Sequence, residues 1–238
     1  MKSFLSFFLS ILLCFSAFSQ ENDFVSFGLE INPRISMQRF EQPLLATSGI
    51  SHGGSISGVA YMNLAPGIEI KTGLNVSLIR IDQTDYSFAF PCDVTSSGFG
   101  NPKASWIHTK SNQFYVGMPI SLKMNLSKKK SHPYISLGGE ALVHLASVQN
   151  IVAHECGASE GTKIQNEIRE NAPILFIANL GLGYECIREN KTDLYMGLVA
   201  GHTLNPTYSE ISNFLNLDDG FNNSRILTLG IVSGIRFK

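Results

Sequence analysis

The chain has 238 residues, a formal net charge of −1 and 16% charged residues, whereas soluble domains carry about 25%. A near-neutral chain without a basic excess gives no reason to expect nucleic acid as a partner. Low charge together with 21 Gly and 16 Phe favours a single β-rich domain with an unusually apolar exterior.

Residues 1–19 have the pattern of a secretory signal peptide. Lys2 precedes an apolar run that ends at Phe18, and Ala17-Phe18-Ser19 resembles a cleavage site of small residues. We therefore expect residues 1–19 to be removed and residues 20–238 to form one exported β-barrel domain. Two alternatives are an uncleaved anchor, for which the run falls short of ~20 residues, and a lipoprotein modified at Cys14, which the leucines before it disfavour.

Eight later stretches alternate apolar and polar residues, as half-buried strands do. In the third of them, Leu74 lies on one face while Glu69 and Lys71 lie on the other. In chain order the predicted strands are Phe24–Ser36, Ser55–Leu64, Gly67–Asp82, Asn112–Leu126, Pro133–Ser147, Pro173–Ile187, Thr192–Leu204 and Arg225–Phe237.

The connections between these stretches alternate in length. The short ones are Ala65–Gly67, Ser127–His132 and Arg188–Lys191, and the long ones are Met37–Gly54, Gln83–Ser111, Ser147–Ala172 and Asn205–Ser224. This predicts an all-β fold: an eight-stranded antiparallel up-and-down transmembrane β-barrel of the cell outer membrane, with short periplasmic turns and four long extracellular loops. A soluble secreted β-barrel with an internal ligand cavity is the alternative.

Two neighbouring segments resemble a known family. Phe114–Asn125 has the aromatic-x-x-x-Pro-aliphatic-x-x-Lys pattern, and His132–Gly139 the Pro-Tyr…Gly pattern, of PorT-like outer-membrane β-barrel domain proteins. The resemblance implies an eight-stranded outer-membrane barrel without shared catalytic residues. Outer-membrane lipid and the barrel-assembly machinery are the partners it implies. Lys238 departs from the pattern, because it places the terminal aromatic residue, Phe237, one position inside the chain.

The alternation directs four acids and four bases toward the barrel interior: Glu30, Arg34, Glu69, Lys71, Lys123, Glu140, Glu185 and Arg236. The interior of an eight-stranded barrel is just filled by side chains, and an unpaired buried charge costs several kcal/mol. We therefore expect a salt-bridged, non-conducting interior. The alternative is a narrow pore or small-solute transport path.

Several further features of the strands are predicted. Pro119 lacks a donor inside a strand and predicts a local bulge. Tyr134, Tyr184 and Phe237 are expected in a periplasmic aromatic girdle. Cys186 has the parity of the lipid-facing side, where a cysteine is an inert small apolar residue.

The long loops carry the remaining features. Tyr86, Phe88, Phe90, Phe99 and Trp106 form either a binding surface for an extracellular or envelope protein partner or a lid of loops packed on one another. Cys92 and Cys156 lie in predicted extracellular loops, where a disulfide and two free thiols are both compatible with the sequence. Short amphipathic helices are predicted over Glu160–Glu170 and Ser209–Leu217.

Signals for catalysis or metal binding are weak. His108 and His154-Glu155-Cys156 lack the spacing of a zinc site, so no metal or cofactor is expected. A lipid-modifying enzyme at the rim would draw on His52, His108 or His202, but no Gly-x-Ser-x-Gly motif accompanies them. The sequence thus favours a monomeric, non-enzymatic barrel with a structural or interaction role, with a pore and a rim-located enzyme as alternatives.

Overall fold

The computed structural model describes residues 25–39, 46–85, 104–127, 129, 131–155, 162–164, 170–187, 192–210 and 224–237. The predicted signal peptide lies outside these residues. So do Cys92, Cys156 and the predicted loop aromatics Tyr86, Phe88, Phe90 and Phe99.

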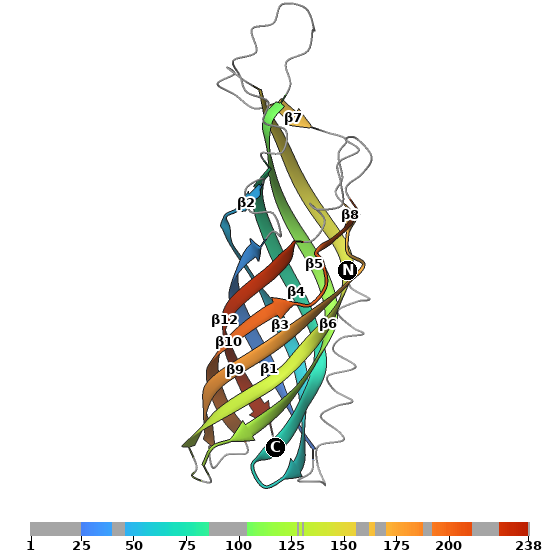
Figure 1. Cartoon of the computed structure of the whole chain (residues 1–238). Helices are drawn as coiled ribbons and strands as arrows, with labels where there is room; N and C mark the ends of the chain where they lie inside the picture. The colour runs from blue at the N-terminus through green and yellow to red at the C-terminus, as the bar shows by residue number, and fades with distance from the viewer. Residues whose placement is uncertain are drawn as a thin grey trace, which may run out of the picture.

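Eight antiparallel strands close into an up-and-down barrel (Figure 1). They are β1 (Val25–Arg39), β3 (Ile50–Ala65), β4 (Ile68–Asp85), β5 (Ala104–Asn125), β6 (Ser131–Glu155), β9 (Ile174–Ile187), β10 (Thr192–Thr203) and β12 (Arg225–Phe237). Each pairs with the next along the chain, and β12 returns to pair with β1. Short strands β2 (Ala46–Ser48) and β7 (Thr162–Ile164) extend this sheet, while β8 (Glu170–Asn171) and β11 (Tyr208–Glu210) form a separate pair.

The strand register fixes the tilt of the barrel. A path along directly paired residues leaves β1 at Ser26 and returns to β1 at Ser36, ten residues further on. The path runs through Tyr61, Lys71, Ser121, Gly138, Asn179, Gly201 and Thr228. A stagger of this kind requires the strands to tilt against the barrel axis, as closed barrels do.

The strand ends at the β3–β4, β5–β6 and β9–β10 connections all lie at the same end of the barrel as the C-terminal end of β12 (Figure 1). The β3–β4 turn places Pro66 and Gly67 between the paired Ala65 and Ile68. Gly67 has a φ of 84°, the left-handed conformation that the third position of a type II turn requires. This end is the periplasmic one, since barrels of this kind have short periplasmic turns.

Apolar side chains face outward and polar ones inward. Leu74, Leu122 and Leu180 are 53%, 38% and 53% exposed, while Glu69 and Lys123 are 6% and 4% exposed. A soluble barrel would show the opposite order, because water and not hydrocarbon would surround it. The outward leucines and inward charges therefore confirm the predicted transmembrane orientation. Among the described residues, no helix has the length and apolar character needed to cross a membrane.

Five strands run further than the sequence predicted. β1 ends at Arg39, β3 begins at Ile50, β4 ends at Asp85, β5 begins at Ala104 and β6 ends at Glu155, inside segments predicted to be loops. Trp106 accordingly lies in β5 and not in a loop. These stretches are polar, which suggested loops, but a paired strand outside the membrane needs no apolar face. β5 and β6 therefore project beyond the barrel as a long ribbon (Figure 1).

The two predicted helices are wrong wherever the structure describes them. Within Glu160–Glu170, residues Thr162–Ile164 form β7, which pairs with β6, and Glu170 belongs to β8. Within Ser209–Leu217, Ser209 belongs to β11. These segments pair with other strands although their apolar residues have helical spacing. Strand pairing is a tertiary interaction, which local periodicity does not predict.

The bulge predicted at Pro119 is also wrong. Pro119 pairs with Glu140 of β6 without a register shift, and on the β4 side the register is the same before and after it. The register shifts between β5 and β6 lie instead between Ala104 and Trp106 and between Phe114 and Tyr115. The missing proline donor faces β4, where the bridge pairs are interrupted between Thr72–Ile120 and Asn75–Gly117, so the ladder accommodates it without an inserted residue.

One member of the predicted girdle faces the other way. Tyr184 and Phe237 are exposed on the outer face, but Tyr134 is 5% exposed and lies inside the barrel. Its parity along β6 is that of Gly138 and Glu140, so alternation already placed it inward.

The outward belt makes a prediction for stability. Leu180→Arg should lower the free energy of unfolding in phospholipid vesicles by about 2–4 kcal/mol, because it moves a charge into the hydrocarbon. Asn150→Arg, at an exposed position on the projecting part of β6, is the matched control and should change it by about 0–1 kcal/mol. Urea titration followed by far-ultraviolet circular dichroism measures both. Equal effects of the two substitutions would contradict the membrane-facing assignment.

Candidate functional site

The barrel interior contains all eight charged residues that the sequence directed there. Seven are buried and Lys71 is partly buried. They separate into two groups: a periplasmic charge layer formed by Glu30, Glu69, Lys71, Lys123, Glu185 and Arg236, and a single pair, Arg34 and Glu140, further from the periplasmic end.

Lys123 and Arg236 are the centre of the periplasmic charge layer. The Lys123 ammonium contacts Glu185 and lies 3.3 Å from a Glu69 carboxylate oxygen. Arg236 donates to Glu69 at 2.8 Å and to the Ser26 hydroxyl at 2.6 Å, and its Nη1 lies 3.6 Å from Glu185. Each carboxylate thus faces both cations. Such reciprocal pairing is what allows charges to remain ionised away from water.

Three tyrosine rings surround the Lys123 ammonium. Its Nζ lies 4.9, 5.5 and 5.9 Å from the ring centroids of Tyr134, Tyr61 and Tyr195. Arg236 lies 4.8 Å from the Tyr61 centroid. Cations within about 6 Å of an aromatic face are attracted by its quadrupole, so the rings both fill the cross-section and stabilise the charges.

Glu30 connects the tyrosines to Lys71. Its Oε1 accepts hydrogen bonds from Tyr61 at 3.1 Å, Tyr195 at 2.8 Å and the Lys71 ammonium at 2.8 Å. Tyr61 and Tyr195 also lie 2.7 Å apart, hydroxyl to hydroxyl. Residues from β1, β3, β4 and β10 therefore meet at one carboxylate.

Glycines provide the space for these rings. A Cβ at Gly183 would overlap the Tyr134 ring, and one at Gly234 would overlap the Tyr195 hydroxyl. These glycines thus have a specific packing cause: small positions on β9 and β12 receive bulky rings from β6 and β10.

Sequence reasoning missed five members of this region. Tyr61, Tyr134 and Tyr195 were not assigned to the interior, and neither were Asp193 and His132, which are 0% and 3% exposed. His132 Nε2 lies 3.4 Å from Glu185, and its Nδ1 lies 3.0 Å from the Lys129 carbonyl. The alternation of inward and outward residues along each strand would have identified Asp193 and the three tyrosines as inward. His132 was not identified because the strand was expected to begin at Pro133.

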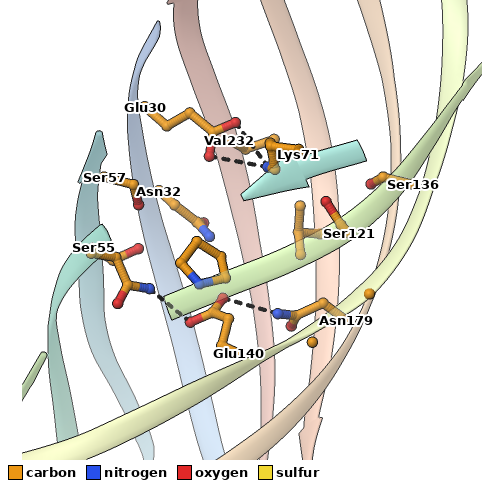
Figure 2. A pocket seen from close by; sticks show the side chains of 15 residues that line it. Glu30, Asn32, Ser55, Ser57, Lys71, Ser121, Ser136, Glu140, Asn179 and Val232 are labelled. Carbon is orange, nitrogen blue, oxygen red and sulfur yellow. Dashed lines mark hydrogen bonds and ion pairs between the residues drawn. The ribbon is translucent and has the colours of Figure 1, made fainter. Parts of the chain in front are cut away.

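A small polar cavity of about 50 Å³ lies next to the charge layer (Figure 2). Glu30 and Lys71 line it together with Glu140. Glu140 accepts from Asn179 at 2.9 Å and Asn75 at 3.1 Å, and Arg34 lies 3.6 Å from it. A cavity of this size has room for a few water molecules, and not for an organic solute.

An apolar layer closes the barrel on the extracellular side of the cavity. Its buried members are Ile79, Ile81, Tyr115, Leu142, Leu175, Ile177 and Ile226, which pack as one cluster with Ala172. Leu142 and Leu175 are both 0% exposed. Apolar constrictions resist the passage of ions because water leaves them.

The rim histidines do not form an evident hydrolytic site. Thr84 Oγ1 and Asp82 Oδ1 lie 3.1 and 3.4 Å from the two ring nitrogens of His108, on the outer face of β4 and β5. Acyl transfer also needs free donors for an oxyanion, whereas these stretches of β4 and β5 are paired on both sides with β2, each other and β6. Among the described residues no group of His, Cys, Asp and Glu is arranged to hold a metal ion.

The geometry defines the class of this protein. A closed antiparallel barrel with an apolar outer belt, a polar filled interior and short turns at one end is a transmembrane β-barrel of the outer-membrane type. No protein-family model matches the sequence, and no curated protein matches it.

Solved structures with a similar barrel exist at low sequence identity. Neisserial surface protein A is 13% identical, with a TM-score of 0.42 over 90% of this chain and 98% of that one. OprG from Pseudomonas aeruginosa is 9% identical, with a TM-score of 0.43 over 90% and 95%. The outer-membrane protease OmpT from Escherichia coli is 10% identical, with a TM-score of 0.34 over 91% and 97%. Similarity this low adds nothing to the class, which rests on the geometry of the chain itself.

The central cation makes a prediction. Lys123→Met should lower the free energy of unfolding by about 3–5 kcal/mol, because it leaves Glu69 and Glu185 buried with Arg236 as their remaining strong cation. Adding Glu185→Gln should restore part of the loss. Lys129→Met, at an exposed position, is the control and should change stability by no more than about 0.5 kcal/mol. Urea titration in detergent micelles measures all three, and a Lys123→Met effect as small as the control would exclude a structural role for the layer.

Proposed function

We propose that the protein is an integral outer-membrane barrel that does not conduct solutes and serves a structural or interaction role at the cell surface. The observation that carries this proposal is the closed interior. A charge layer with three tyrosines and an apolar layer fill the cross-section at two levels, with about 50 Å³ between them.

The size of the cavity argues against the pore alternative. Transport of even a small solute would require at least two filled layers to open, with paired charges separated in one of them. Separating a buried pair costs several kcal/mol. The same packing gives the scaffold stability, which suits a barrel whose function resides outside the membrane.

The projecting ribbon is the surface we propose for interaction. β5 and β6 have 22 and 25 residues, against 14 in β9 and 13 in β12. Beyond Lys110 and Asn150 the two strands stay paired as far as Ala104 and Glu155. A ribbon that extends far past the barrel presents side chains to a partner at a distance from the membrane.

Three parts of the proposal come from the sequence. Membership of the PorT-like family stays a prediction, based on Phe114–Asn125 and His132–Gly139. A non-enzymatic role stays a prediction as well, based on the lack of a Gly-x-Ser-x-Gly motif. Recognition of Phe237 by the assembly machinery also stays a prediction.

Conductance tests the closed interior. Purified protein inserted in planar bilayers should give no stable openings, since neither layer leaves a continuous water path. Insertion is verified first, by the heat-dependent gel mobility of folded barrels. Leu142→Ala should remain closed as well, because the charge layer still seals the barrel. Stable ohmic steps from the wild-type protein would reject the non-conducting interior.

Cross-linking tests the interaction role. A photo-reactive amino acid at Val152, on the ribbon beyond Lys110, should give protein adducts in intact cells. The same amino acid at Leu180, in the lipid-facing belt, should give none. Protein adducts at Leu180 but not at the ribbon would move the partner surface into the membrane, against this proposal.

A further inference from the structure

On four strands, β12, β1, β4 and β5, the outward face changes from apolar to cationic near its extracellular end. On β1 the outward series Leu29, Ile31, Ile35, Met37 ends in Arg39. On β12 Arg225 precedes Leu227, and on β4 Arg80 follows Leu78. On β5 Lys110 precedes Asn112 and Phe114. β3, between β1 and β4, has no Lys or Arg on this face but carries His52 and the 74% exposed Ile50. The cations thus lie directly above the apolar belt, at the level of lipid headgroups.

Two of these cations are direct cross-strand neighbours. Arg39 of β1 pairs with Arg225 of β12, and both are exposed on the outer face. Like charges directly opposite each other destabilise a sheet. Neither arginine forms an ion pair with any residue that the structure describes. An anion between the two guanidinium groups would turn this repulsion into attraction.

The remaining cations continue the band around the barrel. Arg80 Nη1 lies 2.5 Å from His52 Nε2, and Lys110 Nζ lies 3.8 Å from Asp82 Oδ2. Asp82 is the one outward acid whose side chain is described on these stretches. Against it stand Arg39, Arg80, Lys110 and Arg225, so the described band has a surplus of three positive charges.

We propose that this band, formed by Arg39, Arg80, Lys110 and Arg225, binds the phosphate groups of an outer-leaflet lipid. Three observations select a lipid over a soluble anion. The cations face outward and not into the barrel mouth, they begin where the apolar belt ends, and they lie on two pairs of adjacent strands, β12–β1 and β4–β5. A phosphorylated glycolipid can place its acyl chains on the belt and its phosphates between the cations at the same time. The proposal rests on the membrane-spanning barrel proposed above.

The experiment uses the full chain in detergent micelles. The protein is titrated with bisphosphorylated lipid A and, separately, with the same lipid after removal of its phosphates. Native mass spectrometry measures how much lipid is bound. The wild-type protein should bind the phosphorylated lipid and bind the dephosphorylated one far more weakly. The double variants Arg39→Gln/Arg225→Gln and Arg80→Gln/Lys110→Gln should each lose about fivefold in affinity per cation removed.

The matched control is Lys129→Gln, which removes an exposed cation at the periplasmic turn and should leave lipid binding unchanged. Heat-dependent gel mobility confirms that each variant folds. If only one double variant folds, its lipid affinity is sufficient to test the proposal. Equal binding of both lipids would overturn the proposal, as would double variants that bind like wild type. Displacement of the lipid by millimolar inorganic phosphate would assign the band to a soluble anion instead. Flotation with phosphatidylcholine vesicles measures membrane integration separately. A protein that does not insert into membranes is thereby distinguished from one that inserts but does not bind phosphate.

Discussion

Unpaired backbone N–H and C=O groups cost several kcal/mol each in hydrocarbon, and the structure follows from avoiding that cost. Eight strands pair in sequence and the eighth pairs with the first, so the membrane-spanning part has no free edge. Closure with a stagger of ten residues tilts the strands and leaves a narrow interior. Every side chain on these strands then points either to lipid or into that interior, and its chemistry must suit the side it faces.

The narrow interior explains the pairing of charge. Lys123 and Arg236 share Glu69 and Glu185, and Lys71 is paired with Glu30. Tyrosine rings occupy the space that shorter polar residues would leave to water, and the glycines paired with them on the adjacent strands make room for the rings. The result is an interior that is filled by side chains of the barrel wall itself.

Alternation was a reliable guide wherever one face of a strand meets lipid. It placed Leu74, Leu180, Glu69 and Lys123 on their observed faces, because a slip of one residue would put a charge in hydrocarbon. The guide failed beyond the membrane. There β5 and β6 continue through polar residues such as Thr109 and Gln149, whose pairing depends on the neighbouring strand and not on their own pattern.

The amino-acid sequence by itself determined the number of strands, the side each one turns to lipid and the eight charges of the interior, since period-two alternation is a local property. Only the tertiary structure decided which charges pair, that Tyr61, Tyr134 and Tyr195 surround Lys123, and that Arg39 lies opposite Arg225. These contacts join strands far apart in the chain. Their geometry comes from the register and stagger of the closed barrel, which no single segment contains.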